Sequence, residues 1–221
     1  DTNDNRRMRL IAVVVALGAV AVAIGAMWPQ IVTRLPAPLA EMFTKTHNGT
    51  IAHPPVHDSG DLRTVGYACE VMKWFKPALT VGNMDGVDGC HSSFTGYLAA
   101  MHRADHAVGH LWNFIQTQVP EMTNNTVVIA IPECGRNAQP NAIRDQNDWY
   151  SFDHSDANSM RVFGMMAGPG VPTNLSVGGE GNPVGIVTDA VPTIAEVLGV
   201  KNEVMGAGML HGGTMSLFDR I

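Results

Sequence analysis

The stretch that decides the fold reads TVVIAIPECGRN and runs from Thr126 to Asn137. Its first half is largely apolar and predicts a buried strand, because strands of parallel sheets are covered on both faces. The strand ends in an acid, a thiol and a glycine, and the pair Asp153-His154 follows further along the chain. In α/β enzymes, ligands lie at the carboxyl ends of parallel strands. The stretch therefore predicts a metal site at the edge of a sheet.

Hydrophobic periodicity places further elements around this strand. Apolar side chains recur at helical spacing in the long segment that Pro120 ends. Asp189 is expected to cap a helix that Gly199 stops. The predicted elements are a helix over 67–75, a strand over 78–82, a helix over 97–119, strands over 126–131 and 160–166, a helix over 190–198, and a polar loop over 137–151. This order predicts an α/β fold with a mainly parallel sheet and flanking helices.

The composition limits the classes of partner. The 221 residues carry a net charge of -6, and only 15% of them are charged. Because no basic patch follows a phosphate backbone, nucleic acid is not an expected partner. The three cysteines make no disulfide framework. Either Cys69 and Cys90 pair in an oxidising compartment and leave Cys134 unpaired, or all three are thiols.

The N-terminal region is apolar enough to cross a membrane. Residues 10–28 read LIAVVVALGAVAVAIGAMW without a charge, and about 20 apolar residues span a bilayer as a helix. Arg6, Arg7 and Arg9 precede this segment, while Arg34 alone follows it closely. The positive-inside rule therefore places the N-terminal tail in the cytoplasm. The alternatives are a signal peptide, a buried strand or a core helix.

The predicted organisation has four parts. They are a cytoplasmic tail over 1–9, a transmembrane helix over 10–28, a linker over 29–65 and a periplasmic domain over 66–221. Small residues four apart in the apolar segment, such as Ala12 and Ala16, allow close docking against other membrane helices, or the helix is a plain anchor. His47, His53 and His57 in the linker are interpreted as solvated side chains, with a metal site as the alternative.

Two further groups of residues offer metal ligands. His102, His106 and His110 are four apart and share one face of the long predicted helix. This stripe is expected to be a polar face or a contact surface, with a zinc site as the alternative. The loop after the first predicted strand contains Asp88 and His91 among glycines. It offers ligands to a hard or borderline cation, or it is a plain turn.

Several stretches match, in order, the motifs of one enzyme superfamily. They are Ala104 to Leu111, Pro132 to Arg136, Asn141, Asp153-His154, Asp189 to Gly199 and Met215 to Leu217. From about residue 78 onward the chain resembles the C-terminal half of the alkaline phosphatase superfamily, which includes sulfatases and type I phosphodiesterases. It is most similar to an uncharacterised bacterial sulfatase-like family whose signature is Ser-Glu-Phe-Gly-Arg, then Asn, then Asp-His. The resemblance implies a partial alkaline-phosphatase-like fold.

The resemblance also implies a metal site. Enzymes of the superfamily hold two divalent metals that clamp a phosphate or sulfate ester around a nucleophile. The residues that match their ligands are Asp88, His91 and His154 in one site and Glu133 and Cys134 in the other. Cys134 stands where most members have His, and a thiolate is also a zinc ligand. Zinc or another divalent metal is the expected cofactor, and Asp153 or Asp85 is expected to support its ligands.

The superfamily places its nucleophile and a first metal-binding Asp in an N-terminal half that has no match here. We therefore expect either a fragment of a longer protein or a reduced fold without catalysis. The leading hypothesis is an accessory or structural subunit of a larger complex in the bacterial inner membrane, such as a respiratory or photosynthetic assembly. Its partners would be other membrane-protein subunits, reached through the transmembrane helix and the periplasmic domain. The alternatives are a metal-dependent hydrolase of phosphate or sulfate esters and a domain with one structural metal.

Overall fold

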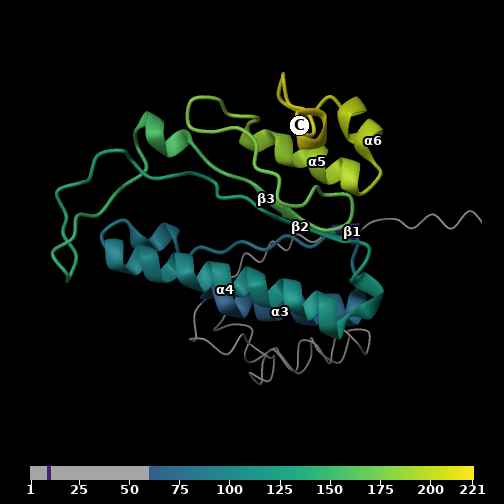
Figure 1. Ribbon diagram of the computed structural model, residues 1–221, viewed down its shortest axis with the longest axis horizontal. Coiled ribbons are helices and arrows are strands. Elements are labelled where there is room, and N and C mark those ends of the chain that lie inside the picture. The colour runs from purple at the N-terminus through teal and green to yellow at the C-terminus, as the bar shows by residue number, and fades with distance from the viewer. Residues whose placement is uncertain (1–8, 11–59) are drawn as a thin grey trace, which may run out of the picture. The chain divides into compact units, whose positions relative to one another are not determined.

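The computed structural model describes Arg9–Leu10 and residues 60–221 (Figure 1). Its helices and strands are β1 (Arg9–Leu10), α3 (Gly60–Phe75), α4 (Phe94–Gln118), β2 (Thr126–Ala130), β3 (Met165–Ala167), α5 (Ala190–Val197) and α6 (Lys201–Gly206). The chain forms two compact units. The helical unit is built on α3 and α4, and the sheet unit comprises the strands, α5 and α6 together with residues 91–94.

Most of the predicted membrane anchor falls outside the described residues. The tail over 1–8, the apolar segment over 11–28 and the linker with its three histidines up to residue 59 all lie there. Leu10, the expected first residue of the transmembrane helix, belongs to β1. Among the helices that the structure describes, none is both long enough and apolar enough to cross a membrane.

The helical unit is held together by an apolar seam between α3 and α4, which lie side by side in Figure 1. The buried residues of the seam are Leu62, Val65 and Cys69 on α3 and Ala107 on α4, with Met84, Leu111 and Phe114 packed against them. Those on α3 are three and four residues apart, so they fall on one helical face. After α4, Thr123 Oγ1 donates a hydrogen bond to Ile115 O at 3.2 Å and closes the last turn.

Both helices of this unit differ from the sequence prediction at their N-terminal ends. The helix predicted over 67–75 begins at Gly60, so residues 60–65 of the expected linker are helical. Its first turn is fixed by Asp61, which is buried and accepts a hydrogen bond from Gly86 N at 3.1 Å. This contact spans 25 positions of the sequence and leaves no local signal. The helix predicted over 97–119 is confirmed as α4, which begins three residues earlier, at Phe94.

The strand predicted over 78–82 is wrong, because these residues have no regular structure. Leu79 is 41% exposed, whereas a strand inside a parallel sheet is covered on both faces. Lys76 turns the chain out of α3 with a φ of 44°, and Pro77 has no N–H to donate to a neighbouring strand. A short apolar run does not reveal whether a partner strand is available.

The sheet unit contains a three-stranded sheet in the order β1-β2-β3. The predicted strand over 126–131 is confirmed as β2, which pairs in parallel with β1 and antiparallel with β3. Helices and a sheet are thus combined, but a mainly parallel sheet is not seen in the described residues. The strand predicted over 160–166 corresponds to β3, which is shorter and begins only at Met165. Just after β3, Gly168 (φ 144°) has no room for a Cβ, which would stand 2.5 Å from Thr126 O.

The core of the sheet unit lies between the sheet and α5. Its buried residues are Val127 and Val197, with Ile129, Met166, Val171, Ile194, Leu198 and Phe218 packed against them. The predicted helix over 190–198 is confirmed as α5, and Gly199 (φ 72°) follows its end. The capping role predicted for Asp189 is wrong for its side chain. That carboxylate binds Ile186 N, Met215 N and Arg220 instead of the first turn of α5.

Candidate metal centre

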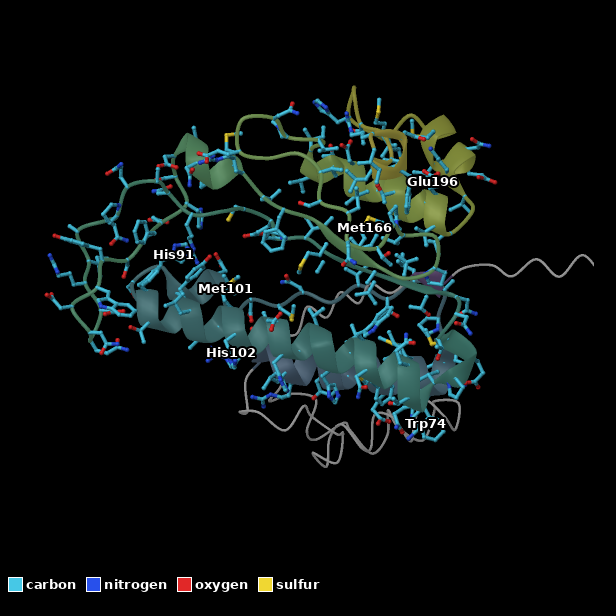
Figure 2. All side chains as sticks on the ribbon, in the orientation of Figure 1. Trp74, His91, Met101, His102, Met166 and Glu196 are labelled. Carbon is cyan, nitrogen blue, oxygen red and sulfur yellow. The ribbon has the colours of Figure 1, made fainter. Side chains whose placement is uncertain are left out.

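His91 stands where the chain passes into α4 (Figure 2). It directly follows the short 3-10 helix Asp88–Cys90. Its carbonyl oxygen accepts a hydrogen bond from Asn141 Nδ2 at 3.2 Å. The backbone that carries His91 is therefore fixed from a distant loop, through a residue that the sequence marks only as part of a motif.

The ring of His91 is oriented by Asp153. Nδ1 lies 3.0 Å from Asp153 Oδ1 and 3.4 Å from Arg136 Nη1. An ionised carboxylate only accepts and a guanidinium only donates, so one ring nitrogen cannot serve both. The shorter contact assigns the proton to Nδ1, while Arg136 donates to Phe152 O at 3.5 Å. In this tautomer Nε2 carries the lone pair through which an imidazole binds a cation.

His154 brings a second imidazole to the first. The ring centroids of His91 and His154 are 4.6 Å apart, with an interplanar angle of 63°. The backbone N of His154 donates to Asp153 Oδ1 at 2.8 Å, so the same oxygen serves both histidines. The backbone N–H of His154, followed by the His91 ring, holds the pKa of Asp153 below its ordinary value. Asp153 is therefore an ionised link between the two histidines.

Within the described residues, one group of side chains could hold a metal ion: Asp88, His91 and His154. Their candidate ligand atoms all lie within 4.8 Å of one another. The contacts of the sheet unit fix the two imidazoles, and Asp88 precedes His91 by three positions in the chain. Two imidazoles and a carboxylate suit zinc, which commonly takes three protein ligands and one further ligand. The donor set therefore fits one divalent cation.

Glu133 and Cys134 are not part of this group. Glu133 is exposed and Cys134 is half-buried, both in the loop that follows β2. The next residue, Gly135, donates its N–H to Ser159 O at 2.7 Å, and a Cβ on it would stand 2.6 Å from Arg161 O. Gly135 thus allows two backbones to approach closely, which gives this predicted metal-binding stretch a structural role.

The remaining candidate ligands form no metal-binding group in the part of the chain that the structure describes. His102 is exposed on α4 (Figure 2). Burial, followed by the charge of His106, lowers the pKa of His110. The cysteines are all unbridged, so the disulfide alternative for Cys69 and Cys90 is not formed. Burial raises the pKa of the Cys69 thiol to about 12, which makes it a poor thiolate donor.

Three polar residues of the site had no individual role in the sequence analysis. They are Arg136, Asn137 and Asn141, all within or just after the stretch that decides the fold. Their contacts reach residues 16 to 50 positions away, so spacing along the chain could not reveal them. The available signal was the motif match for Arg136 and Asn141 and, for Asn137, its position after a strand end, where polar side chains of α/β folds gather.

Comparisons of the chain with protein-family models, with curated proteins and with solved structures gave no significant match. The resemblance to the alkaline phosphatase superfamily therefore remains a prediction from the motifs.

Proposed function

We propose that His91 and His154, with Asp88 as the third ligand, hold one divalent cation that stabilises the fold without catalysis. The observation that carries this proposal is the contact between His91 Nδ1 and Asp153 Oδ1. A carboxylate behind a histidine is the usual way to fix the tautomer and direction of a metal-binding imidazole. The second imidazole lies close to this oriented ring, with 4.6 Å between the two ring centroids.

The ligand set suits a single divalent cation. Such a cation accepts lone pairs from both imidazoles at once and is partly neutralised by the Asp88 carboxylate. A cation that binds the folded chain alone stabilises it by RT ln(1 + [M]/Kd), about 2.7 kcal/mol at a hundredfold excess over Kd.

A thermal-melting experiment tests the structural role of the site. The full chain is purified and melted in EDTA and in zinc, beside His91→Ala, His154→Ala and His102→Ala. His102 is a matched control because it is an exposed histidine on α4. We expect zinc to raise the Tm of the wild type and of His102→Ala only. Equal Tm values for all four proteins in both buffers would contradict the structural role.

At the level of the whole chain, we propose a membrane-anchored, periplasm-facing accessory or structural subunit of a larger membrane protein complex. Support comes from the apolar segment over 10–28 and the arginines before it, together with the motifs of a reduced sulfatase/phosphatase-like domain. A Val14→Asp/Val20→Asp variant tests the anchor, because charges at the bilayer centre oppose insertion. We expect the wild type to resist alkaline extraction from bacterial inner membranes and the variant to be released. Release of both would contradict the anchor.

The second candidate is a metal-dependent hydrolase of phosphate or sulfate esters, and Arg136 is the observation that favours it. Its guanidinium lies 3.4 Å from His91 Nδ1, and a guanidinium beside a divalent cation matches the charge of an ester oxyanion. Turnover of a generic aryl phosphate or sulfate ester distinguishes this candidate. Turnover that is lost in Arg136→Ala and in His154→Ala would replace the non-catalytic proposal.

A further inference from the structure

The turn that carries His154 is bound on both sides to a single residue, Asn137. We propose that Asn137 is a positioning residue of the metal centre, which holds His154 against His91 before the cation binds. This inference rests on the proposed metal site and adds to it a residue that contacts neither ring. Asn137 belongs to the loop after β2, within the stretch that decides the fold, yet neither the sequence motifs nor the ligand group give it a role.

Asn137 forms hydrogen bonds to the residues on both sides of His154 in the chain. The backbone N of Asn137 donates to Asp153 O at 2.7 Å, which fixes the residue before His154. Its Oδ1 accepts from Ser155 N at 2.6 Å and from Asp156 N at 2.8 Å, which fixes the two residues after it. Its Nδ2 donates to Ser155 Oγ at 3.0 Å. One asparagine therefore makes four hydrogen bonds to the residues that flank the histidine.

The wider contact between the two segments does not depend on the Asn137 side chain. Ala138 N donates to Asp156 Oδ2 at 2.9 Å, and Asn158 Nδ2 donates to Arg136 O at 2.7 Å. These bonds would keep the loop after β2 against the turn in a variant that lacks the Asn137 amide. Truncation of Asn137 is therefore expected to loosen the His154 turn without separating the segments.

Positioning matters here because metal affinity depends on ligand geometry. A site must hold its ligands within about 0.5 Å of the productive arrangement, and ligands that must be ordered on binding weaken it. Residues behind the ligands commonly contribute about 10- to 100-fold to metal affinity. Asn137 acts through the backbone on each side of the ligand, so we expect an effect at the lower end, about tenfold.

Cobalt titration tests this role, because Co²⁺ reports both affinity and coordination geometry through its visible absorption. The full chain is titrated beside Asn137→Ala, Asn137→Asp, Asn158→Ala and His154→Ala. Asn137→Asp keeps the oxygen that accepts from Ser155 N and Asp156 N, and the Ser155 hydroxyl can rotate to donate. Asn158→Ala removes a different bond between the same two segments and is the matched structural control.

We expect Asn137→Ala to bind Co²⁺ about tenfold more weakly than the wild type, with a changed visible spectrum. Asn137→Asp and Asn158→Ala should stay within about twofold of the wild type, although Asn158→Ala lowers the Tm in EDTA. Asn137→Gln keeps every donor and acceptor but displaces them by one methylene. Asn137→Gln should also bind Co²⁺ more weakly than the wild type. It tests the positioning role if the alanine variant does not fold.

The outcomes separate this inference from the metal site itself. Wild-type affinity and spectrum in Asn137→Ala or Asn137→Gln, with binding lost in His154→Ala, would overturn the positioning role and leave the site intact. An equal loss of affinity in Asn158→Ala and Asn137→Ala would also overturn it, because the effect would then be general. Failure of the wild type to bind Co²⁺ would overturn the metal site and the inference together.

Discussion

Asp153 decides what His91 can do. Its carboxylate accepts one hydrogen bond from Nδ1–H of His91 and another from the backbone N–H of His154. A half-exposed aspartate thus fixes the tautomer of one ligand and the backbone of the other. The sequence predicts support from either Asp153 or Asp85, and the structure places Asp153 against His91.

The first prediction concerns this carboxylate. Asp153→Asn replaces the carboxylate, which only accepts hydrogen bonds, by an amide that can either accept or donate. The protonated nitrogen of His91 is then no longer fixed at Nδ1. Zinc affinity is expected to fall about 10- to 100-fold, measured by competition with a chelating dye. Asp148→Asn is the matched control, since Asp148 forms an exposed ion pair with Arg144 in the same unit. Equal affinities of the two variants would contradict the role of Asp153.

The second prediction concerns Gly135. A Cβ at this position would stand 2.6 Å from the carbonyl oxygen of Arg161, and a backbone oxygen cannot move aside cheaply. Gly135→Ala is therefore expected to lower the free energy of unfolding by about 1–3 kcal/mol, measured by urea denaturation. Gly181→Ala, where a Cβ meets nothing within 4 Å, is the control. The prediction fails if both variants unfold at the same urea concentration.

Among the secondary-structure elements, α5 depends most clearly on a buried charge. Asp189 is fully buried before α5, and its carboxylate binds Arg220, Ile186 N and Met215 N. Thr193 Oγ1 of α5 adds a bond from Leu217 N at 2.8 Å. The C-terminal segment is thereby attached to the start of the helix. Burial raises the pKa of Asp189, but Arg220 and the two backbone N–H groups outweigh it and lower the pKa overall.

The third prediction follows from this attachment. Asp189→Ala leaves the Arg220 charge and two backbone donors without their acceptor, so the free energy of unfolding is expected to fall by about 3–5 kcal/mol at pH 7. Asp219→Asn is the control, because Asp219 binds Lys201 at a partly exposed site and such pairs contribute little. A loss no larger in Asp189→Ala than in Asp219→Asn would contradict the buried role.

The pH dependence of this carboxylate has a definite sign. The pKa of Asp189 is lower in the folded chain than its ordinary value of 3.8, so the folded chain binds the proton less readily than the unfolded chain. Its contribution is complete above pH 3.8 and is lost as the pH falls through the lowered value. The stability difference between the wild type and Asp189→Ala should therefore shrink in acid, as measured by denaturation at stepwise lower pH. A difference that grows in acid would contradict this sign.

Some of the helices and strands could be predicted from the sequence, and others could not. Long periodic segments were predicted correctly as α4 and α5, because one apolar face is enough to define a helix. β2 was predicted because its apolar residues are bounded by polar turns. The strand over 78–82 failed because pairing depends on a neighbour that local sequence does not show. The capping role of Asp189 could not be judged from the sequence, because the groups that its carboxylate binds lie up to 31 positions away.

For the whole molecule, the sequence and the structure contribute different parts of the proposal. The structure brings together Asp88, His91 and His154, which the superfamily resemblance had marked as ligands of one site. It leaves Glu133 and Cys134 outside that group, and spacing could not predict this because it says nothing about side-chain direction. The apolar segment over 10–28 remains a sequence prediction. Together they are the basis of the proposed anchored domain with one metal site.

The metal content of the purified full chain tests this account most directly. The chain is loaded with zinc, dialysed and analysed by mass spectrometry for bound metal, beside a His91→Ala/His154→Ala variant, and each sample is assayed with a generic aryl phosphate ester. We predict one divalent ion per chain in the wild type, none in the variant, and no turnover by either protein. Two bound ions with ester turnover, or equal metal content in the wild type and the variant, would contradict the account.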